Sequence, residues 1–81
     1  MLHKIIKVKA KENFIIVAKF QNGVNKEYNV RKMMNKFEIF NQLNDINLFK
    51  NVQVDKGGCG ISWSENIDLS SEEIWKNGTE I

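Results

Sequence analysis

The stretch that decides the fold is FIIVAKFQNGVNKEYNV, residues 14–30. It contains two runs rich in β-branched and aromatic residues, joined by Asn22-Gly23. Both residues of this dipeptide tolerate positive φ, which the two central positions of a type I′ turn require. The stretch therefore predicts a β-hairpin with strands over 14–20 and 24–30 and a two-residue turn. The side chains expected on its buried face are Phe14, Ile16, Ala18, Phe20, Val24, Tyr28 and Val30.

A further strand is predicted on the N-terminal side of this hairpin. Ile6, Val8 and Ala10 alternate there with lysines, and a period of two places apolar side chains on one face and charges on the other. The charged face carries Lys7, Lys9 and Lys11. The first third of the chain thus predicts a three-stranded antiparallel sheet with one face rich in lysine.

Helical spacing replaces the strand pattern from Arg31 onward. Apolar residues recur at three- and four-residue intervals, at Met33, Met34, Phe37, Phe40 and Leu43. This pattern predicts one main amphipathic helix packed on the sheet. A short helical turn over 45–50 should follow, capped by Asn44 or Asp45, with Ile46 and Phe49 directed at the same core.

A second hairpin is predicted beyond this helix. Residues 52–54 and 61–63 read as short strands on either side of Asp55-Lys56-Gly57-Gly58-Cys59-Gly60, a loop too rich in glycine to be regular.

The C-terminal segment carries a helix-start signal. Ser70 and Glu73 have the spacing of a capping box, and Leu69 and Ile74 that of a hydrophobic staple. A short helix should follow, with Asn77-Gly78 as a left-handed stop and residues 79–81 as a tail that frays. The overall prediction is an α+β fold in which the antiparallel strands pack against one main helix, with a short C-terminal helix.

Length and composition limit the class of protein. The 81 residues have room for one core, so we expect a single domain over 1–81. Cys59 is the only cysteine and no apolar run approaches the roughly 20 residues of a membrane span, so we expect a cytoplasmic protein without a disulfide and without membrane contact. The net charge of +2 divides unevenly, with +7 in residues 1–36 and −5 in residues 37–81.

The glycine-rich loop is the most tempting place for chemistry. Backbone amides of such a loop can hold an anion, and Lys56 stands beside it, but the Lys-Ser/Thr of a phosphate-binding loop is missing. Cys59 would need a base to become a nucleophile, and the only histidine is His3. One His and one Cys cannot complete a zinc site, and the carboxylates match no calcium-loop spacing. We therefore expect no catalytic residues, no metal and no cofactor.

The lysines offer a second candidate site. Lys7, Lys9, Lys19 and Lys26 form the best case for a partner-binding or nucleic-acid-binding face, because spaced cations can neutralise phosphates. The alternative is a solvated sheet face neutralised by the acidic half of the same chain.

Aromatic and loop residues supply the remaining candidates. The strand alternation puts the aromatic residues of the hairpin on the apolar face, so a stacking platform for single-stranded nucleic acid is not evident. Candidate interface or loop residues are Lys56, Cys59, Trp63 and Asp68. Trp63 and Trp75 could anchor a partner, but residues of this kind more often belong to the core.

The order of motifs resembles a known family. The most specific parts are the F-x-N-G turn, Phe20 to Gly23, and the W-x-x-x-I-D-L run, Trp63 to Leu69. These resemble the bacterial domain-of-unknown-function family numbered 2442, although Asn29 stands where many relatives have Asp. The resemblance implies a compact α+β fold and a prokaryotic source, and it supplies no catalytic residues. It also implies a gene arrangement that looks like a toxin–antitoxin pair.

These observations lead to three hypotheses of function. The first is a non-enzymatic protein-binding domain, the regulatory or antitoxin-like half of a two-protein module, whose partner is another small protein or a second copy. The second is a nucleic-acid-binding domain that uses the lysine-rich strands. The third is an enzyme that uses Cys59.

Overall fold

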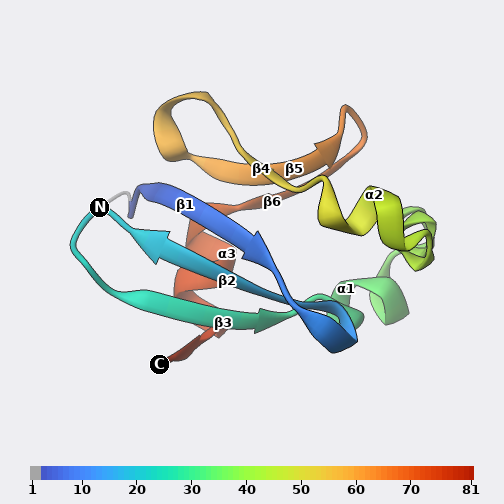
Figure 1. Ribbon diagram of the computed structural model, residues 1–81, viewed down its shortest axis with the longest axis horizontal. Helices are drawn as coiled ribbons and strands as arrows, with labels where there is room; N and C mark the ends of the chain where they lie inside the picture. The colour runs from blue at the N-terminus through green and yellow to red at the C-terminus, as the bar shows by residue number, and fades with distance from the viewer. Residues whose placement is uncertain (1–2) are drawn as a thin grey trace.

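The hairpin strand β2 lies inside a four-stranded antiparallel sheet in the computed structural model, which describes residues 3–81 (Figure 1). In spatial order the strands of this first sheet are β1 (Ile5–Ala10), β2 (Ile15–Phe20), β3 (Asn25–Asn29) and β7 (Thr79–Glu80). The predicted three strands are confirmed, and the C-terminal strand adds a fourth.

The turn between β2 and β3 differs from the predicted type. Phe20 and Val24 close the loop, because the Phe20 N–H donates to the Val24 carbonyl at 2.8 Å, and the Gly23 N–H donates to the Phe20 carbonyl at 2.9 Å. Gly23 has φ +92°, whereas Asn22 is not among the residues with positive φ. The hairpin therefore has a three-residue loop, a type I turn followed by a left-handed glycine, and the predicted type I′ turn is wrong.

A bulge in β1 reverses one predicted orientation. Ile5 lies opposite Phe20 and Lys7 lies opposite Lys19, so Ile6 is an extra residue without a partner in β2. Ile5 is buried and Ile6 is 55% exposed, which corrects the expectation that Ile6 faces the core. The bulge shifts the alternation by one residue, so that Ile5 and the later apolar residues of β1 share the inner face.

The second sheet contains the predicted second hairpin and one more strand. Its order is β4 (Gln53–Val54), β5 (Gly60–Ser64) and β6 (Ile67–Ser70), all antiparallel. The strand β6 follows β5 through a tight turn that the sequence reading did not assign. β4 and β5 run beside β1, and the 3₁₀ turn η3 (Lys56–Gly58) touches the β1 backbone.

The predicted main helix is interrupted in the middle. α1 (Arg31–Lys36) ends where Phe37 takes an extended conformation, and a 3₁₀ helix, η2 (Glu38–Asn44), follows. Side chains three apart are eclipsed in a 3₁₀ helix. The three-residue spacing of Phe40 and Leu43 therefore suits η2, in which both are buried. Phe37 precedes η2 and is 47% exposed, which corrects its predicted place on the buried stripe.

The next helix, α2 (Ile46–Lys50), has the cap that the sequence predicts. The Asp45 carboxylate accepts hydrogen bonds from the N–H groups of Asn47 and Leu48. Phe49 is buried as expected, but Ile46 is 48% exposed, so its predicted place in the core is wrong. Ile46 is the first residue of α2, and its side chain is partly exposed to solvent.

α3 (Ser71–Asn77) covers the inner face of the first sheet and lies behind it in Figure 1. The Ser70 hydroxyl accepts from the Glu73 N–H at 3.1 Å, which confirms the predicted N-cap. The Glu73 carboxylate accepts instead from the buried Tyr28 hydroxyl and from the Asn77 amide, both at 2.9 Å. One carboxylate thus ties the helix to β3.

The C-terminal residues correct two expectations. Gly78 has φ −78°, so it is not a left-handed stop; a Cβ there would lie 2.5 Å from the Ile74 carbonyl oxygen. Glycine is needed at this position because the backbone passes close to α3. Thr79 and Glu80 pair with β3, and the Ile81 N–H donates to the Asn25 carbonyl at 3.1 Å, so the segment does not fray.

One hydrophobic core is shared by the two sheets and the helices, which confirms the α+β class. Its largest fully buried side chains include Tyr28, Phe20, Ile5, Ile16, Leu43, Ile61, Ile67 and Ile74. Among residues 3–81, no helix has the length and apolar character needed to cross a bilayer.

The close approach of the glycine-rich loop to β1 generates a stability prediction. Gly58 has φ +75°, and a Cβ there would lie 2.6 Å from the carbonyl oxygen of Ile5. We expect Gly58→Ala to lower the free energy of unfolding by about 3 kcal/mol, from backbone strain and overpacking together. Gly23→Ala is the control, since its φ is also positive but its surroundings are open, and it should cost about 1 kcal/mol. Urea denaturation measures both, and equal losses would contradict the role given to the contact.

Candidate functional site

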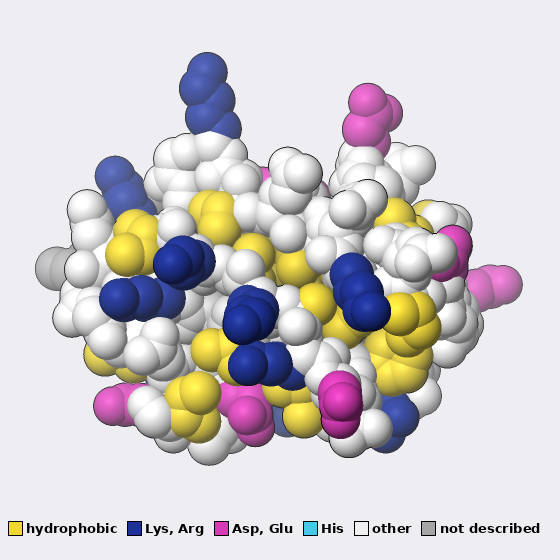
Figure 2. All heavy atoms as spheres, in the orientation of Figure 1, with side chains coloured by type: hydrophobic (Ala, Val, Ile, Leu, Met, Phe, Trp, Pro, Cys, Tyr) yellow, Lys and Arg dark blue, Asp and Glu magenta, His cyan; other side chains and the backbone are white. Residues whose placement is uncertain are grey.

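The outer face of the first sheet gathers the lysines that the sequence singles out. We call the exposed surface formed by Lys7, Lys9, Lys11, Lys19 and Val17 the lysine face. Figure 2 shows dark-blue cationic side chains across this side of the molecule, above β1 and β2, with yellow hydrophobic atoms between them. A shallow hollow of about 190 Å³ lies among these five residues. The lysine face is therefore a mixed cationic and apolar surface.

The register of β1 and β2 sets the spacing of these charges. Lys7 lies directly opposite Lys19, and Lys9 lies opposite the half-buried Val17. Like charges directly opposite each other on a sheet are destabilising. Within residues 3–81 the only ion pair joins His3 and Glu72, so none of these lysines forms an ion pair, although Glu27 lies on the same face opposite Val17.

Lys26 does not belong to this face. It pairs with Ala18 in the β2–β3 register, which places it on the inner face, and its ammonium group lies 4.7 Å from the centre of the Trp75 ring. The prediction that Lys26 shares a face with Lys7, Lys9 and Lys19 is wrong. Alternation from the three-residue turn puts Glu27, and not Lys26, on the outer side.

A cluster that the sequence reading missed lies at the start of α3. The His3 N–H donates to the Glu72 carboxylate at 2.6 Å, and its ring Nδ1 lies 3.1 Å from the same carboxylate. The His3 ring stacks on Trp75, with 3.9 Å between the ring centres. The hydrogen bonds from the His3 backbone and ring hold the pKa of Glu72 below its ordinary value. No local spacing could indicate this cluster, because 69 residues separate the partners.

Tyr28 and Glu73 form the buried polar link beside this cluster. Burial raises the pKa of the Tyr28 phenol, and the charge and hydrogen bond of Glu73 raise it further. The phenol therefore stays protonated and donates to the carboxylate.

The glycine-rich loop is occupied by its own hydrogen bonds. The Gly58 N–H donates to the Asp55 carbonyl, and the Ser62 hydroxyl donates to the Asp55 carboxylate at 2.7 Å. Cys59 is exposed, and its carbonyl accepts from the Ser71 N–H. The loop lies beside Ile5 of β1 and the first residue of α3, Ser71. His3 is near this point, but its ring is already held by Glu72 and Trp75. The N–H groups of Asp55 and Gly58 are thus used in shaping the hairpin.

The remaining candidate residues are not brought together. Trp63 is 6% exposed and its indole N–H donates to the Phe49 carbonyl at 3.0 Å, so it belongs to the core. Lys56 is exposed beside the loop, and Asp68 is exposed on β6 opposite Ser62. In the described part of the chain, no three His, Cys, Asp or Glu side chains are grouped so that they could hold a metal ion.

Comparison with known proteins gave one match. A family model described as Protein of unknown function (DUF2442) matches residues 5–80, nearly the whole chain. The match agrees with the resemblance that the turn motif and the Trp63–Leu69 run indicate. No curated protein and no solved structure matches the chain.

The His3–Glu72 pair generates a prediction of pH dependence. The pKa of Glu72 is lower in the folded state than in the unfolded state, so its contribution to stability is full above the unfolded value, near 4.5, and is lost as pH falls through the folded value. Glu72→Gln should therefore lower the free energy of unfolding at pH 7, and the difference from wild type should shrink below pH 4.5. Glu65→Gln, in the exposed β5–β6 turn, is the control. Urea titrations between pH 3 and pH 7 that give a constant difference would contradict this account.

Proposed function

Since the chain belongs to the family described as Protein of unknown function (DUF2442), we propose a function from its own surface: a non-enzymatic domain whose lysine face binds an acidic surface of another small protein. The observation that carries the proposal is the direct opposition of Lys7 and Lys19, with Lys9 beside them and no acidic residue paired to any of them. Carboxylates from a partner would relieve this repulsion, so the energetic gain is available only in a complex.

Apolar atoms between the lysines favour a protein as the partner. Ile15 and Val17 are half-buried on the outer face, and Ile81 lines a second hollow beside them. Protein interfaces combine an apolar centre with a polar rim. This surface has that arrangement on a small scale, because Val17 lies between Lys9 of β1 and Glu27 of β3, with Lys7 and Lys19 nearby.

The rival is a nucleic acid bound by the same lysines, and the composition of the face argues against it. Recognition of single strands relies on aromatic side chains that stack on bases. The aromatic residues of β2 and β3, Phe20 and Tyr28, are buried on the inner face.

We further propose that the chain acts as the regulatory, antitoxin-like half of a two-protein module, and that catalysis is not its role. The family resemblance supports the pairing with a second small protein. The engagement of His3 by Glu72 and Trp75 supports a structural role for the one histidine that could have served Cys59 as a base.

Charge reversal on the lysine face tests the proposal. Lys9→Glu/Lys19→Glu should weaken binding to the partner by about tenfold or more, because two attractive contacts become repulsive. Lys32→Glu/Lys76→Glu changes the net charge equally at exposed sites elsewhere and should leave affinity within about threefold. The measurement is calorimetric titration with the product of the adjacent gene, after circular dichroism has confirmed that both variants fold.

Two outcomes would contradict the proposal. The first is equal affinity of both double variants for the partner, and the second is a native purification in which neither the adjacent gene product nor any other acidic protein accompanies the chain. A mobility-shift assay at low salt with single-stranded and double-stranded oligonucleotides tests the rival hypothesis of nucleic-acid binding. A shift that Lys9→Glu/Lys19→Glu removes would favour nucleic acid instead.

A further inference from the structure

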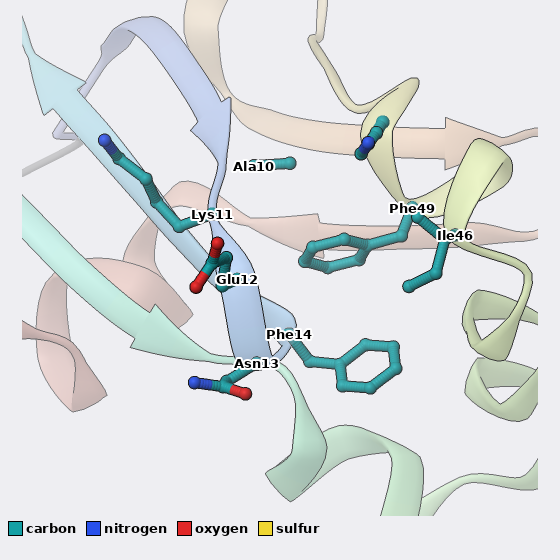
Figure 3. A pocket seen from close by; sticks show the side chains of 8 residues that line it. Ala10, Lys11, Glu12, Asn13, Phe14, Ile46 and Phe49 are labelled. Atoms are coloured by element: carbon teal, nitrogen blue, oxygen red, sulfur yellow. The ribbon is translucent and has the colours of Figure 1, made fainter.

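A pocket lies between the β1–β2 connection and α2, at the end of the sheet away from the glycine-rich loop (Figure 3). Its volume is about 590 Å³, and it is open to solvent on one side. Figure 3 shows the side chains of Phe14, Ile46 and Phe49 pointing toward one another across the gap, with Ala10 at its edge. Ile46 is 48% exposed here, although it is a large apolar residue. The accessible apolar walls of the pocket are thus Phe14 and Ile46, and the buried Phe49 ring packs against Phe14.

The wall formed by Phe14 is held in a strained backbone. Asn13 and Phe14 both have φ +61°, in the left-handed region that bulky residues avoid. The Lys11 N–H donates to the Ile15 carbonyl at 2.7 Å and the Val30 N–H to the Phe14 carbonyl at 2.9 Å, so the connection is fixed on both sides. Glycine at these two positions would adopt the positive φ at a lower cost in free energy. What Phe14 adds is a ring packed edge to face on Phe49, with 5.4 Å between ring centres.

The charges around the pocket are mainly positive. Lys50 lines it from α2, and the guanidinium of Arg31 lies 5.3 Å from the centre of the Phe14 ring. Lys11 and Glu12 also line the pocket, but Figure 3 shows the Lys11 ammonium group pointing away from the apolar side chains. A ligand in this place would meet apolar walls and one lysine, Lys50, so its body should be apolar and its charge negative.

We propose that this pocket binds a monocarboxylate with an aromatic or branched aliphatic body. The volume lies within the range of small-molecule sites, roughly 300–1,000 Å³. Contacts with the Phe14 ring and the exposed Ile46 side chain bind the body, and Lys50 attracts the carboxylate. This chemistry can come from a free organic acid or from the C-terminal aromatic residue of a peptide. The site lies beyond the proposed protein interface and shares only Lys11 with the lysine face.

The test is a ligand titration of the ¹⁵N-labelled full chain followed by NMR. Phenylacetate should shift the amide signals of residues 10–14 and 46–50 in a saturable way, with a Kd of about 1–10 mM. Phenylacetamide has the same shape without the charge, and its affinity should be lower by about threefold or more.

Two matched pairs of variants assign the interactions. Lys50→Gln should weaken phenylacetate about threefold and leave phenylacetamide unchanged, whereas Lys56→Gln, at an exposed lysine in the other loop, should change neither. Ile46→Ser should weaken both ligands about threefold or more, and Ile39→Ser, at an exposed isoleucine of η2, should not.

A second arm distinguishes the sources of the carboxylate. If N-acetyl-glycyl-phenylalanine binds the same residues more tightly than phenylacetate, the natural ligand is a peptide C-terminus. If phenylacetate binds more tightly, the natural ligand is a free acid. The proposal is overturned if neither compound gives saturable shifts at residues 10–14 and 46–50 up to 20 mM, a limit about twice the weakest expected Kd. It is also overturned if acid and amide bind equally, or if the shifts centre on Lys7, Lys9 and Lys19. None of these results depends on whether the lysine face binds a protein.

Discussion

The packing of α3 on the inner face of the first sheet is the constraint on which the arrangement of the molecule depends: Ile74 joins Tyr28 in the hydrophobic core, and the Tyr28 hydroxyl donates to the Glu73 carboxylate. A buried hydroxyl needs an acceptor, and α3 supplies it from a residue whose own N–H is capped by Ser70. The bond fixes a helix of only seven residues against the inner face of the first sheet. Because that face is covered, the lysines on the opposite face are left in solvent.

The same packing places two carboxylates of the acidic half away from the lysines. Glu72 and Glu73 lie at the start of α3, behind the sheet, where they bind His3 and Tyr28. On the outer face Glu27 stands opposite Val17, and no ion pair joins it to a lysine in residues 3–81. Charge balance over the whole chain therefore coexists with a strongly basic surface, and this local excess makes the outer face suited to an acidic partner.

The strained β1–β2 connection links the two proposed sites. Lys11 lies at the end of β1, where it contributes to the lysine face and also to the pocket beside α2. Asn13 and Phe14 set the direction in which the chain leaves this point. Backbone strain persists only where surrounding contacts hold it in place, and here the Val30 amide and the Phe49 ring do so.

Residues a few positions apart are enough to predict the hairpin at Asn22-Gly23, a cap at Asn44 or Asp45, the Ser70 cap and the lysine alternation of β1, because each of these features depends on near neighbours in the chain. Only the tertiary structure decided the β1 bulge that exposes Ile6, the break at Phe37 and the place of Lys26 over Trp75. The His3–Glu72 pair and the strand β7 belong to the same group. These features arise from contacts between distant segments, whose energies compete with local preference and leave no regular spacing in the chain.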